Sequence, residues 1–592
     1  MRQFEHFASL TALFFARAAE RGDRPFLSAK VDGAWVSRSW AAVARDVAAL
    51  AAGLVAEGVK PGDRVMLVSE NRPEFCIADL AIMAMGGVTV PTYTTNMTRD
   101  HAHIITDSGA SAVIFSSAKI GKQLMPAVLR SSIRLAIAME PQRSMQEGNV
   151  RLLDWDALLA AHPADVAATA AAQTANRADL ACIIYTSGTG GSPRGVMQHH
   201  GAILCNVEGC NDILAGDFGW DDPEVFLSFL PLSHAYEHSA GQYLPIAMGG
   251  EIHYAESLEK LAANITEARP TVMVVVPRLF ELLRVRITKA IAKEGRLAGW
   301  LLDVALAQGA RAARRGGIPW WEAPLGAILD RTIRPKIRAR FGGRLKALVS
   351  GGAPLNPEVG RFFEALGLTL LQGYGQTEAG PVISCNRPRA GVRMDSVGPP
   401  LKNVELRIAA DGEILVRGEL VMHGYWRNKA ETARVLQGGW LHTGDIGEID
   451  EGGRLRITDR KKDLIVNDKG DNVAPQRVEG MLTLQPEIGQ AMVFGDRRPH
   501  LVALIVPDPD FISEWSAMNG NRRENDPAFL ALLRAAVDRV NADLSVTEKV
   551  RRFILADEPF TVENGEMTPS LKIRRHVIRG RYQERLEGLY GG

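Results

Sequence analysis

Hydrophobic and polar positions alternate in blocks along the first part of the chain. From about residue 40 to 130, apolar segments with helical spacing such as AAVARDVAALAAGLVAEG alternate with short β-rich runs such as RVMLV and AVIFS. This alternation predicts βαβ units and a parallel sheet. The same pattern returns in VMVVVPRLFELL and LKALVSGGAPL, which flank a long, basic, helical segment from about 284 to 340. One large α/β body with two sheet subdomains is therefore expected.

The pattern changes twice after this body. Residues 395 to 460 hold short strands broken by Gly and Asp, as in VELRIAADGEILVRG and GEIDEGGRLRITD, which predict hairpins or a small barrel. The last 130 residues have strands of their own (AMVFG, LVALIVP) and helices. The predicted fold class is α/β: a large N-terminal domain of two α/β sheet subdomains and a β-rich part, residues 1–461, then a smaller α+β domain, residues 462–592.

The N-terminus can be interpreted in two ways. FASLTALFFARAA resembles the apolar region of a short signal peptide, but Glu5 precedes it, and Phe4, Phe7, Leu10 and Phe14 fall at helical spacing. An amphipathic helix is the favoured interpretation.

Composition narrows the classes of function. At 592 residues, and with roughly 150 residues per domain, the chain is multidomain. It is 46% hydrophobic and 23% charged, and no run approaches the roughly 18 apolar residues of a membrane span. The formal net charge is +1, which gives no reason to expect nucleic acid as a partner. Five cysteines without CxxC spacing argue against a disulfide framework and a zinc site. A cytoplasmic protein that binds small molecules is expected.

A glycine-rich loop follows the apolar run LACII. It is YTSGTGGSPRGV, Tyr185 to Val196. Gly, Thr and Ser after a buried strand can direct backbone N–H groups and hydroxyls at an anion, which favours phosphate. The loop lacks the GxxxxGK[ST], GxGxxG and GxSxG patterns of other nucleotide or hydrolase sites. A glycine-rich surface turn is the alternative.

The loop resembles the phosphate-binding signature YTSGTTGxPKGV of the adenylate-forming superfamily, with Gly190 in place of a Thr and Arg194 in place of a Lys. Further motifs follow in that family's order: SGGAPL (Ser350 to Leu355), GYGQTE (Gly373 to Glu378), LHTGD (Leu441 to Asp445), DRKKD (Asp459 to Asp463) and TPSLKIRR. LPLSHAYEH, ARPTVMVVVPRLFE and DLIVNDKGDNVAPQRVE are most similar to the long-chain acyl-CoA synthetase branch, with Lys469 in place of a usual Gly.

The resemblance implies a reaction. ATP and a fatty acid, with a long chain favoured, form acyl-AMP with release of pyrophosphate, and the thiol of coenzyme A then displaces AMP. It implies catalytic roles for Lys572, His234 and Thr377, and Mg²⁺ held by Thr186 and Glu378, a hard-oxygen set that suits this ion. The C-terminal domain is implied to be mobile.

The resemblance also implies which residues contact the nucleotide or coenzyme A. Tyr374 would stack on adenine, Asp445 would bind the ribose hydroxyls, and Arg460 would contact ribose or phosphate. Lys462 would be the hinge, and Gly470 would form the turn beside the pantetheine channel. The other implied contacts are Thr186, Ser187, Gly188, Thr189, Gly190, Gly191, Arg194, Gly351, Gly352, Ala353, Gly373, Gly375 and Thr377.

Several alternatives stay open. His234 and His238 have the i, i+4 spacing of a metal pair, although the sequence offers no third ligand nearby. The enzyme could be an acyl-AMP ligase that loads a carrier protein, or a ligase for an aromatic or medium-chain acid. A non-catalytic nucleotide-binding protein is a further alternative, but the retention of Lys572, Glu378 and Asp445 argues against it. A peripheral membrane contact and a homodimer are also open.

Overall fold

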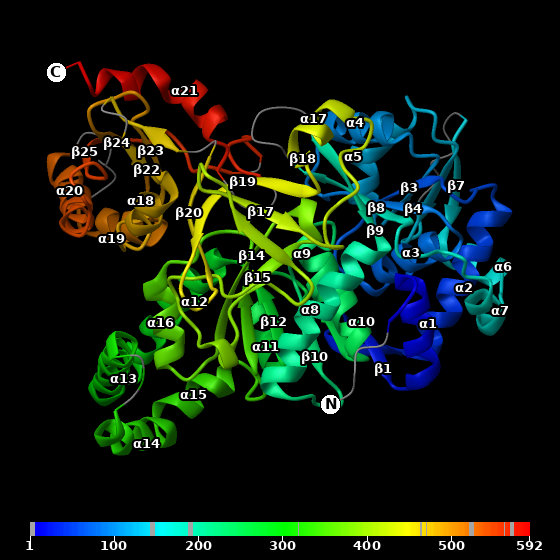
Figure 1. Ribbon diagram of the computed structural model, residues 1–592, viewed down its shortest axis with the longest axis horizontal. Coiled ribbons are helices and arrows are strands. Elements are labelled where there is room, and N and C mark those ends of the chain that lie inside the picture. Colours follow the sequence, from blue (N-terminus) through cyan, green and yellow to red (C-terminus); the bar gives the residue numbers. More distant parts are fainter. Residues whose placement is uncertain are drawn as a thin grey trace. The chain divides into compact units, whose positions relative to one another are not determined.

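The computed structural model describes residues 6–591 except 143–148, 187–192, 316, 318, 462–463, 469–470, 520–525, 562 and 569–572. The chain divides into two compact units. The first comprises Met1–Arg407, Leu415–Thr443 and Ile449–Arg456, and the second comprises Ile408–Ile414, Gly444–Glu448 and Ile457–Gly592. The α/β fold class is confirmed, with a large first unit and a smaller second one (Figure 1).

The first sheet of the large unit has the strand order β7-β6-β5-β3-β4-β8-β9. Its strands are β3 (Arg64–Val68), β4 (Val88–Pro91), β5 (Ala112–Phe115), β6 (Leu135–Ala138), β7 (Arg151–Asp154), β8 (Leu180–Thr186) and β9 (Arg194–His199). The central strands are continuous apolar runs because helices cover a parallel sheet on both faces. The accompanying helices are α2 (Trp40–Ala56), α3 (Pro73–Ala84), α4 (Thr98–Ser108), α5 (Ala118–Val128), α6 (Trp155–Ala161) and α7 (Val166–Ala171).

The second sheet has the order β15-β14-β13-β12-β10-β11-β1-β2. Its strands are β1 (Pro25–Val31), β2 (Ala34–Ser39), β10 (Val225–Ser228), β11 (Glu251–Tyr254), β12 (Val272–Val275), β13 (Ala347–Ser350), β14 (Leu370–Gly375) and β15 (Val382–Cys385). Around it lie α8 (His200–Phe218), α9 (Ala235–Glu237), the π-helix η1 (His238–Tyr243), α10 (Leu244–Met248), α11 (Leu261–Ala268) and α16 (Pro357–Ala365). The two predicted sheet subdomains are thus present.

The predicted N-terminal helix is present, but it begins later than its apolar spacing suggests. Helix α1 spans Leu10–Arg21, and the Ser9 side chain caps it by accepting a hydrogen bond from the Ala12 N–H. Leu10 and Phe14 are buried on it. Phe7 is also buried but precedes the helix, and Phe4 lies outside the described residues.

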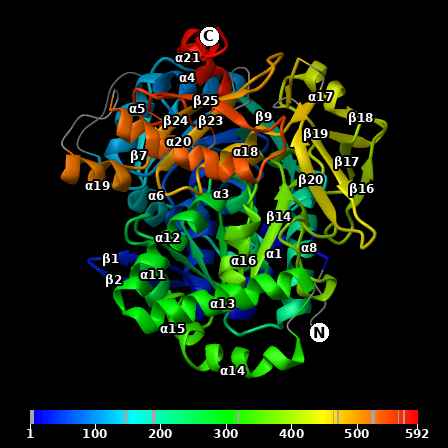
Figure 2. The same ribbon diagram turned by 90° about the vertical axis from the view of Figure 1, so that its left-hand side faces the viewer.

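The predicted basic helical segment forms four α-helices and one short 3₁₀ turn. These are α12 (Pro277–Lys293), α13 (Arg296–Arg315), η2 (Trp320–Glu322), α14 (Ala323–Arg331) and α15 (Ile333–Arg340). Figure 2 shows α13 crossing the lower part of the view, with α14 below it. Helix α13 packs closely on α16, where a Cβ on Gly309 would meet the Ala365 methyl at 2.7 Å.

Residues 395–460 form the predicted β-rich part. It contains β16 (Glu405–Ile408), β17 (Glu413–Arg417), α17 (Lys429–Val435), β18 (Leu436–Gln437), β19 (Trp440–Ile449) and β20 (Leu455–Arg460). Short 3₁₀ turns, η3 (Thr377–Ala379) and η4 (Pro388–Ala390), precede it.

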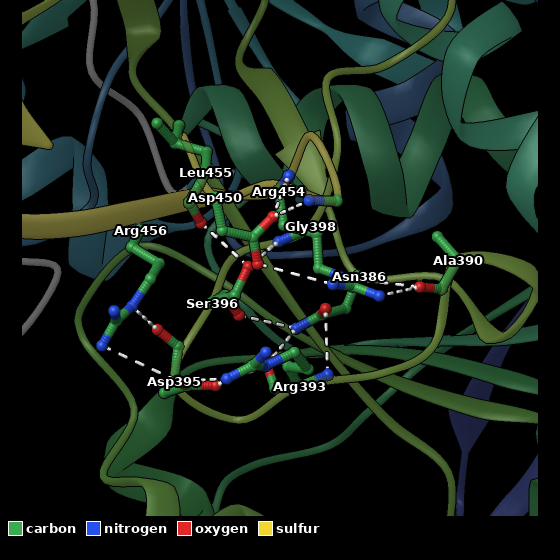
Figure 3. A network of polar contacts seen from close by, with 11 residues as sticks. Asn386, Ala390, Arg393, Asp395, Ser396, Gly398, Asp450, Arg454, Leu455 and Arg456 are labelled. Atoms are coloured by element: carbon green, nitrogen blue, oxygen red, sulfur yellow. Dashed lines mark hydrogen bonds and ion pairs between the residues drawn. The ribbon is translucent and has the colours of Figure 1, made fainter. Parts of the chain in front are cut away.

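A polar network fixes the loop that follows β15 (Figure 3). The buried Asn386 amide donates to the carbonyl oxygens of Arg393 and Ser396 at 2.9 and 2.7 Å. The Ser396 hydroxyl donates to the Leu455 carbonyl at 2.9 Å, and Arg454 donates to the Ala390 carbonyl. The network therefore anchors residues 386–398, which follow β15, to the turn at residues 450–455.

The second unit has a three-stranded sheet with the order β23-β24-β25. Its strands are β23 (Ile488–Phe494), β24 (Leu501–Pro507) and β25 (Val550–Leu555), with a separate hairpin of β21 (Ile465–Val466) and β22 (Asn472–Val473). Its helices are α18 (Pro475–Leu482), α19 (Pro509–Asn519), α20 (Pro527–Ala542) and α21 (Arg575–Gly588). Two buried clusters form its core, one of which includes Val478, Phe529 and Leu533, and the other Ile578 and Tyr582.

Candidate active site

The second sheet brings three of the predicted segments to one edge. Strands β10, β12, β13 and β14 run parallel, so the loops after their carboxyl ends emerge on the same side, where ligands bind in open α/β sheets. His234 follows β10, Gly351–Ala353 follow β13, and Gln376–Glu378 follow β14, which ends at Gly375. The parallel topology therefore places these candidates together.

The predicted phosphate loop lies in sequence between β8 and β9, which pair as an antiparallel hairpin. Thr186 is the last residue of β8 and pairs with Arg194, the first residue of β9. Ser187, Gly188, Thr189, Gly190 and Gly191 lie outside the described residues. Strand β9 packs against the turn η3, which contains Thr377 and Glu378. Strand β9, which begins at Arg194, is thus held beside the acidic motif.

Arg194 is held by an acid that the sequence analysis did not single out. Its guanidinium is paired with Glu431 of α17 and lies over the ring of Tyr425, 4.6 Å from the ring centre. Glu431 also accepts two hydrogen bonds from Arg434, at 2.8 and 2.6 Å. These hydrogen bonds, and then the charge of Arg194, lower the pKa of Glu431 to about 2. Glu431 is therefore a carboxylate at any physiological pH.

Tyr425 connects this pair to the acidic motif. Its segment lies against β9, because the Trp426 N–H donates to the Gly195 carbonyl at 2.7 Å and the Met197 N–H donates to the Gly424 carbonyl at 3.0 Å. Its phenol donates to Glu378 Oε1 at 2.8 Å. Burial, and then the negative charge of Glu378, raise the pKa of the Tyr425 phenol. Tyr425 therefore remains a donor that fixes the Glu378 carboxylate.

Two glycines at this edge are required by close packing. A Cβ on Gly375 would lie 1.8 Å from the Pro381 carbonyl oxygen, and one on Gly351 would lie 2.8 Å from the Tyr236 ring. Gly373 pairs with Cys385 within the sheet, and Gly352 has a φ of +82°. Ala353 is exposed. The backbone can thus make sharp turns where the sequence predicts a nucleotide.

Tyr374 and Thr377 are both positioned by the backbone at the end of β14. Tyr374 is buried and opposite Ser384 of β15. The Thr377 carbonyl accepts a hydrogen bond from the Gln198 side chain of β9. Gln198 is a second contact that the sequence analysis missed, since 179 positions separate it from Thr377.

The two histidines of LPLSHAYEH have different environments. His234 is partly buried and caps α9, with Nδ1 accepting a hydrogen bond from the Tyr236 N–H at 3.2 Å. His238 is fully buried, with Nε2 at 2.9 Å from Asp79 Oδ2. Burial alone would raise the pKa of Asp79, but His238 and the phenol of Tyr243 hold that pKa below its usual value. His238 is therefore bound to a core carboxylate, which gives no support to a metal pair with His234.

Asp445 and Arg460 come together in the second unit. Arg460 Nε lies 3.3 Å from Asp445 Oδ1, and Asp445 is buried. The neighbouring Gly444 N–H donates to Glu413 Oε1 at 2.8 Å, and Lys461 Nζ contacts Asp411 and Glu413 at 2.7 and 3.2 Å. Lys462, Gly470 and Lys572 lie outside the described residues, so their predicted roles rest on the sequence.

The residues predicted to hold Mg²⁺ fit this ion chemically. The described residues contain no group of three or more His, Cys, Asp or Glu side chains arranged for a metal. Mg²⁺ is usually held by one or two protein oxygens together with substrate phosphates and water. The Glu378 carboxylate, fixed by Tyr425, and the Thr186 hydroxyl are oxygen ligands of the required kind.

Comparison with known proteins identifies the family. Residues 14–426 match the AMP-binding enzyme family, and residues 462–592 match the AMP-binding enzyme C-terminal domain. The chain belongs to the AMP-binding enzyme family. The resemblance to adenylate-forming enzymes that the motifs indicated is confirmed.

Relatives of this AMP-binding enzyme are similar along almost the whole chain. It is 34% identical over 600 residues to the long-chain fatty acid–CoA ligase FadD15 of Mycobacterium tuberculosis, covering 98% of this chain and 97% of that one. It is 31% identical to the peroxisomal long chain acyl-CoA synthetase 7 of Arabidopsis thaliana, covering 94% and 81%.

Solved structures of AMP-binding enzymes share the fold. The adenylation domain of a carboxylate reductase from Mycobacterium chelonae has a TM-score of 0.76 at 24% identity, covering 99% of this chain and 92% of that one. The o-succinylbenzoate coenzyme A synthetase of Bacillus subtilis, solved with AMP, has a TM-score of 0.68 at 21% identity, covering 95% and 97%.

The described cysteines are all free, as expected from their spacing.

Proposed function

We propose that this AMP-binding enzyme is an AMP-forming acid–thiol ligase that converts a long-chain fatty acid to its coenzyme A thioester at the expense of ATP. The observation that carries the proposal is the fixed arrangement of Arg194, Tyr425 and Glu378 beside the predicted phosphate loop. The similarity to ligases named for long-chain fatty acids, along almost the full length of both chains, supports the substrate class.

The first half-reaction joins two anions. A carboxylate oxygen of the fatty acid attacks the α-phosphorus of ATP, the bond to the β-phosphate oxygen breaks, and pyrophosphate leaves with its electron pair. Aligned cations and donors are needed to stabilise this transition state. We assign this role to Lys572, Arg194, the loop amides of Ser187–Gly191 and the Thr377 hydroxyl. His234 is assigned to the carboxylate end of the acyl group.

Arg194 can bind phosphate without leaving Glu431. A guanidinium has five N–H donors in a planar fork, and a lysine has one point charge. One edge of Arg194 can remain on Glu431 while another binds a phosphate oxygen. This would explain how an Arg functions where the family usually has a Lys, and why an acid on α17 accompanies it.

Mg²⁺ would be held by Glu378 and Thr186 and, when bound, would neutralise negative charge on the ATP phosphates. The chain's own part in this is positional. Tyr425 donates to one oxygen of Glu378 and leaves the other for a further interaction. Tyr425 therefore contacts both charged groups: its ring lies under Arg194, and its hydroxyl holds Glu378. Arg194 is held in addition by Glu431.

In the second half-reaction, after pyrophosphate has left, a thiol displaces AMP. The sulfur of coenzyme A attacks the acyl carbon of acyl-AMP, and the bond between that carbon and the AMP oxygen breaks to release AMP. Tyr374 and Gly351–Ala353 are assigned to adenine, and Asp445 and Arg460 to the ribose. Gly470 is assigned to the pantetheine path. We propose domains at 1–461 and 462–592, with Lys462 as the hinge between the two half-reactions.

The proposed location is cytoplasmic, with a homodimer and a peripheral membrane contact as further proposals. No helix in the described part of the chain is long and apolar enough to cross a membrane. The formal net charge of the whole chain, +1, gives no reason to expect nucleic acid as a partner.

The test is pyrophosphate release over a panel of carboxylic acids, with and without coenzyme A. If an apolar tunnel buries the chain, each methylene adds about 0.8 kcal/mol, so eight more carbons add roughly 6 kcal/mol. We expect palmitate to have a much higher specificity constant than octanoate, and thioester to form only with coenzyme A. Equal constants, or a preference for cinnamate-type acids, would exclude the long-chain substrate. Pyrophosphate release without thioester formation would exclude the acid–thiol ligase.

A further inference from the structure

Positive charge is concentrated in the helices α12 to α15. Residues 277–340 contain fourteen Lys or Arg and five Asp or Glu, a net charge of +9, whereas the whole chain has a net charge of +1. The remainder of the chain is therefore at −8. Glu294 and Asp330 pair only with cations of the same helices, namely Lys336, Arg338, Arg340 and Arg334, in the contacts that the structure describes. This region is a distinct basic surface on an almost neutral protein.

The same helices expose large apolar side chains. Three tryptophans are outermost: Trp320 is 82% exposed, and Trp300 and Trp321 are each 58% exposed. Leu282, Val285, Leu297 and Ile328 are exposed as well. These seven are more than a third of the nineteen exposed large hydrophobic residues in the described part of the chain. We call this combination the basic aromatic surface, comprising α12, α13, η2 and α14.

These side chains are not directed at the core. Helix α12 buries Phe280, Ile287 and Ile291 on one face, and its exposed residues lie elsewhere on the helix. Arg286 and Lys289 are exposed four residues after Leu282 and Val285, the spacing that makes helical side chains neighbours, and the exposed Lys293 lies four residues after Lys289. Figure 2 shows α13 and α14 on the near side of the first unit.

We propose that the basic aromatic surface docks this enzyme on an anionic lipid bilayer. Trp side chains partition to the headgroup level, and a helix face with Leu, Val, Lys and Arg lies at the bilayer boundary. Lys and Arg beside them attract anionic headgroups. This inference rests on the proposed function: docking would give the enzyme access to its substrate, because a long-chain fatty acid resides in the bilayer.

Charge complementarity favours this occupant over the others. A two-fold contact between two copies of this surface would place two surfaces of net positive charge against each other, which is repulsive. A nucleic acid would satisfy the cations, but its phosphates offer nothing to the exposed Leu282, Val285, Leu297 and Ile328. An anionic bilayer satisfies both the charges and the apolar side chains.

Vesicle sedimentation tests the proposal with the full chain, without fatty acid, ATP or coenzyme A. We expect binding to vesicles of equal parts phosphatidylcholine and phosphatidylglycerol, little binding to pure phosphatidylcholine, and weaker binding as salt screens the charges. Because no reaction is measured, loss of ligase activity would overturn the proposed function and leave this result intact. Absence of binding to the anionic vesicles would overturn the inference and leave the proposed function intact.

Matched variants locate the surface. Trp300→Gln with Trp320→Gln should weaken vesicle binding by roughly tenfold or more, since it removes two interfacial aromatics. Met518→Gln with Val546→Gln removes two side chains of the second unit that are 77% and 74% exposed, and should have no effect. Arg286→Gln, Lys293→Gln and Arg296→Gln together should lower binding and its salt dependence. Lys119→Gln, Lys122→Gln and Arg130→Gln, exposed on or next to α5, form the charge control.

Each outcome decides the question. Folded tryptophan variants, checked by thermal melting, that bind anionic vesicles as tightly as the wild type would overturn the assignment. So would charge controls that lose as much binding as the basic variants. Binding of duplex DNA without vesicle binding would assign the surface to nucleic acid. Concentration-dependent dimerisation that the tryptophan variants abolish, again without vesicle binding, would assign it to a second copy.

Discussion

The Tyr425 phenol donates a hydrogen bond to Glu378 Oε1 at 2.8 Å, although 47 positions separate the two residues. The contact exists because residues 424–426 pair with β9, while the turn that holds Glu378 packs on the same strand. The carboxylate assigned to Mg²⁺ is thus oriented by a tyrosine that also lies against Arg194, the cation at the end of the phosphate loop.

Tyr425→Phe should impair acyl-AMP formation through Glu378. A hydrogen bond to a charged group is worth about 1.5–3 kcal/mol, so we expect a loss of roughly ten- to a hundredfold, largest at limiting Mg²⁺. Pyrophosphate release measured over a series of Mg²⁺ concentrations tests this. Tyr590→Phe is the control, because that phenol donates to the carbonyl oxygens of Phe494 and His500 in the second unit. An unchanged Mg²⁺ requirement in folded Tyr425→Phe would refute the positioning role.

Asp445→Asn should weaken ATP binding. Asparagine keeps the shape but has one acceptor oxygen in place of two, so it cannot accept one ribose hydroxyl on each oxygen, and it removes the charge opposite Arg460. We expect the KM for ATP to rise by roughly tenfold or more, with a smaller change in the KM for the fatty acid. Asp557→Asn breaks an exposed 2.7 Å pair with Arg585 and should change neither constant. A higher KM for the fatty acid alone would contradict the ribose assignment.

Glu237 should make stability depend on pH. Burial raises the pKa of this carboxyl from 4.5 to about 8, while the Ser228 hydroxyl donates to it at 2.6 Å. Between these values the folded protein keeps a proton that the unfolded chain releases, so the free energy of unfolding falls as pH rises. Glu237→Gln cannot titrate. We expect the variant and the wild type to have similar free energies of unfolding near pH 4.5, and the variant to be more stable than the wild type by a few kcal/mol near pH 8.

Thermal melting of both proteins across that range measures the difference. Glu364→Gln is a partial control, since burial raises the pKa of Glu364 only to about 7, so its advantage should level off at lower pH. Parallel melting curves for the wild type and Glu237→Gln over the whole range would show that Glu237 is ionised in the folded state.

Lys572→Ala should act on adenylation alone. A cation about 4 Å from developing charge at an effective dielectric near 20 is worth about 4 kcal/mol, or roughly three decades in rate. We expect acyl-AMP formation to fall by that factor, while conversion of supplied acyl-AMP and coenzyme A to thioester persists. Lys549→Ala, in the same domain, serves as the control. If both half-reactions fell equally in a folded Lys572→Ala protein, the assigned role would be wrong.

The sequence alone predicted the buried strands and the family. RVMLV and LVALIVP coincide with β3 and β24, because buried parallel or central strands require unbroken apolar runs that a local pattern displays. The GYGQTE motif also carries a glycine at a position of close backbone packing. Only glycine fits where Gly375 approaches the Pro381 carbonyl, so the residue type at this position reflects a constraint of the fold.

Only the tertiary structure decided which side chains meet. Glu431 at Arg194, Tyr425 at Glu378, and Asp79 at His238 join residues 237, 47 and 159 positions apart. No periodicity encodes such pairs, since they depend on which strands lie adjacent and on how helices cover them. For the same reason, the i, i+4 spacing of His234 and His238 suggested a metal pair, whereas the packing of α3 gives His238 a buried carboxylate instead.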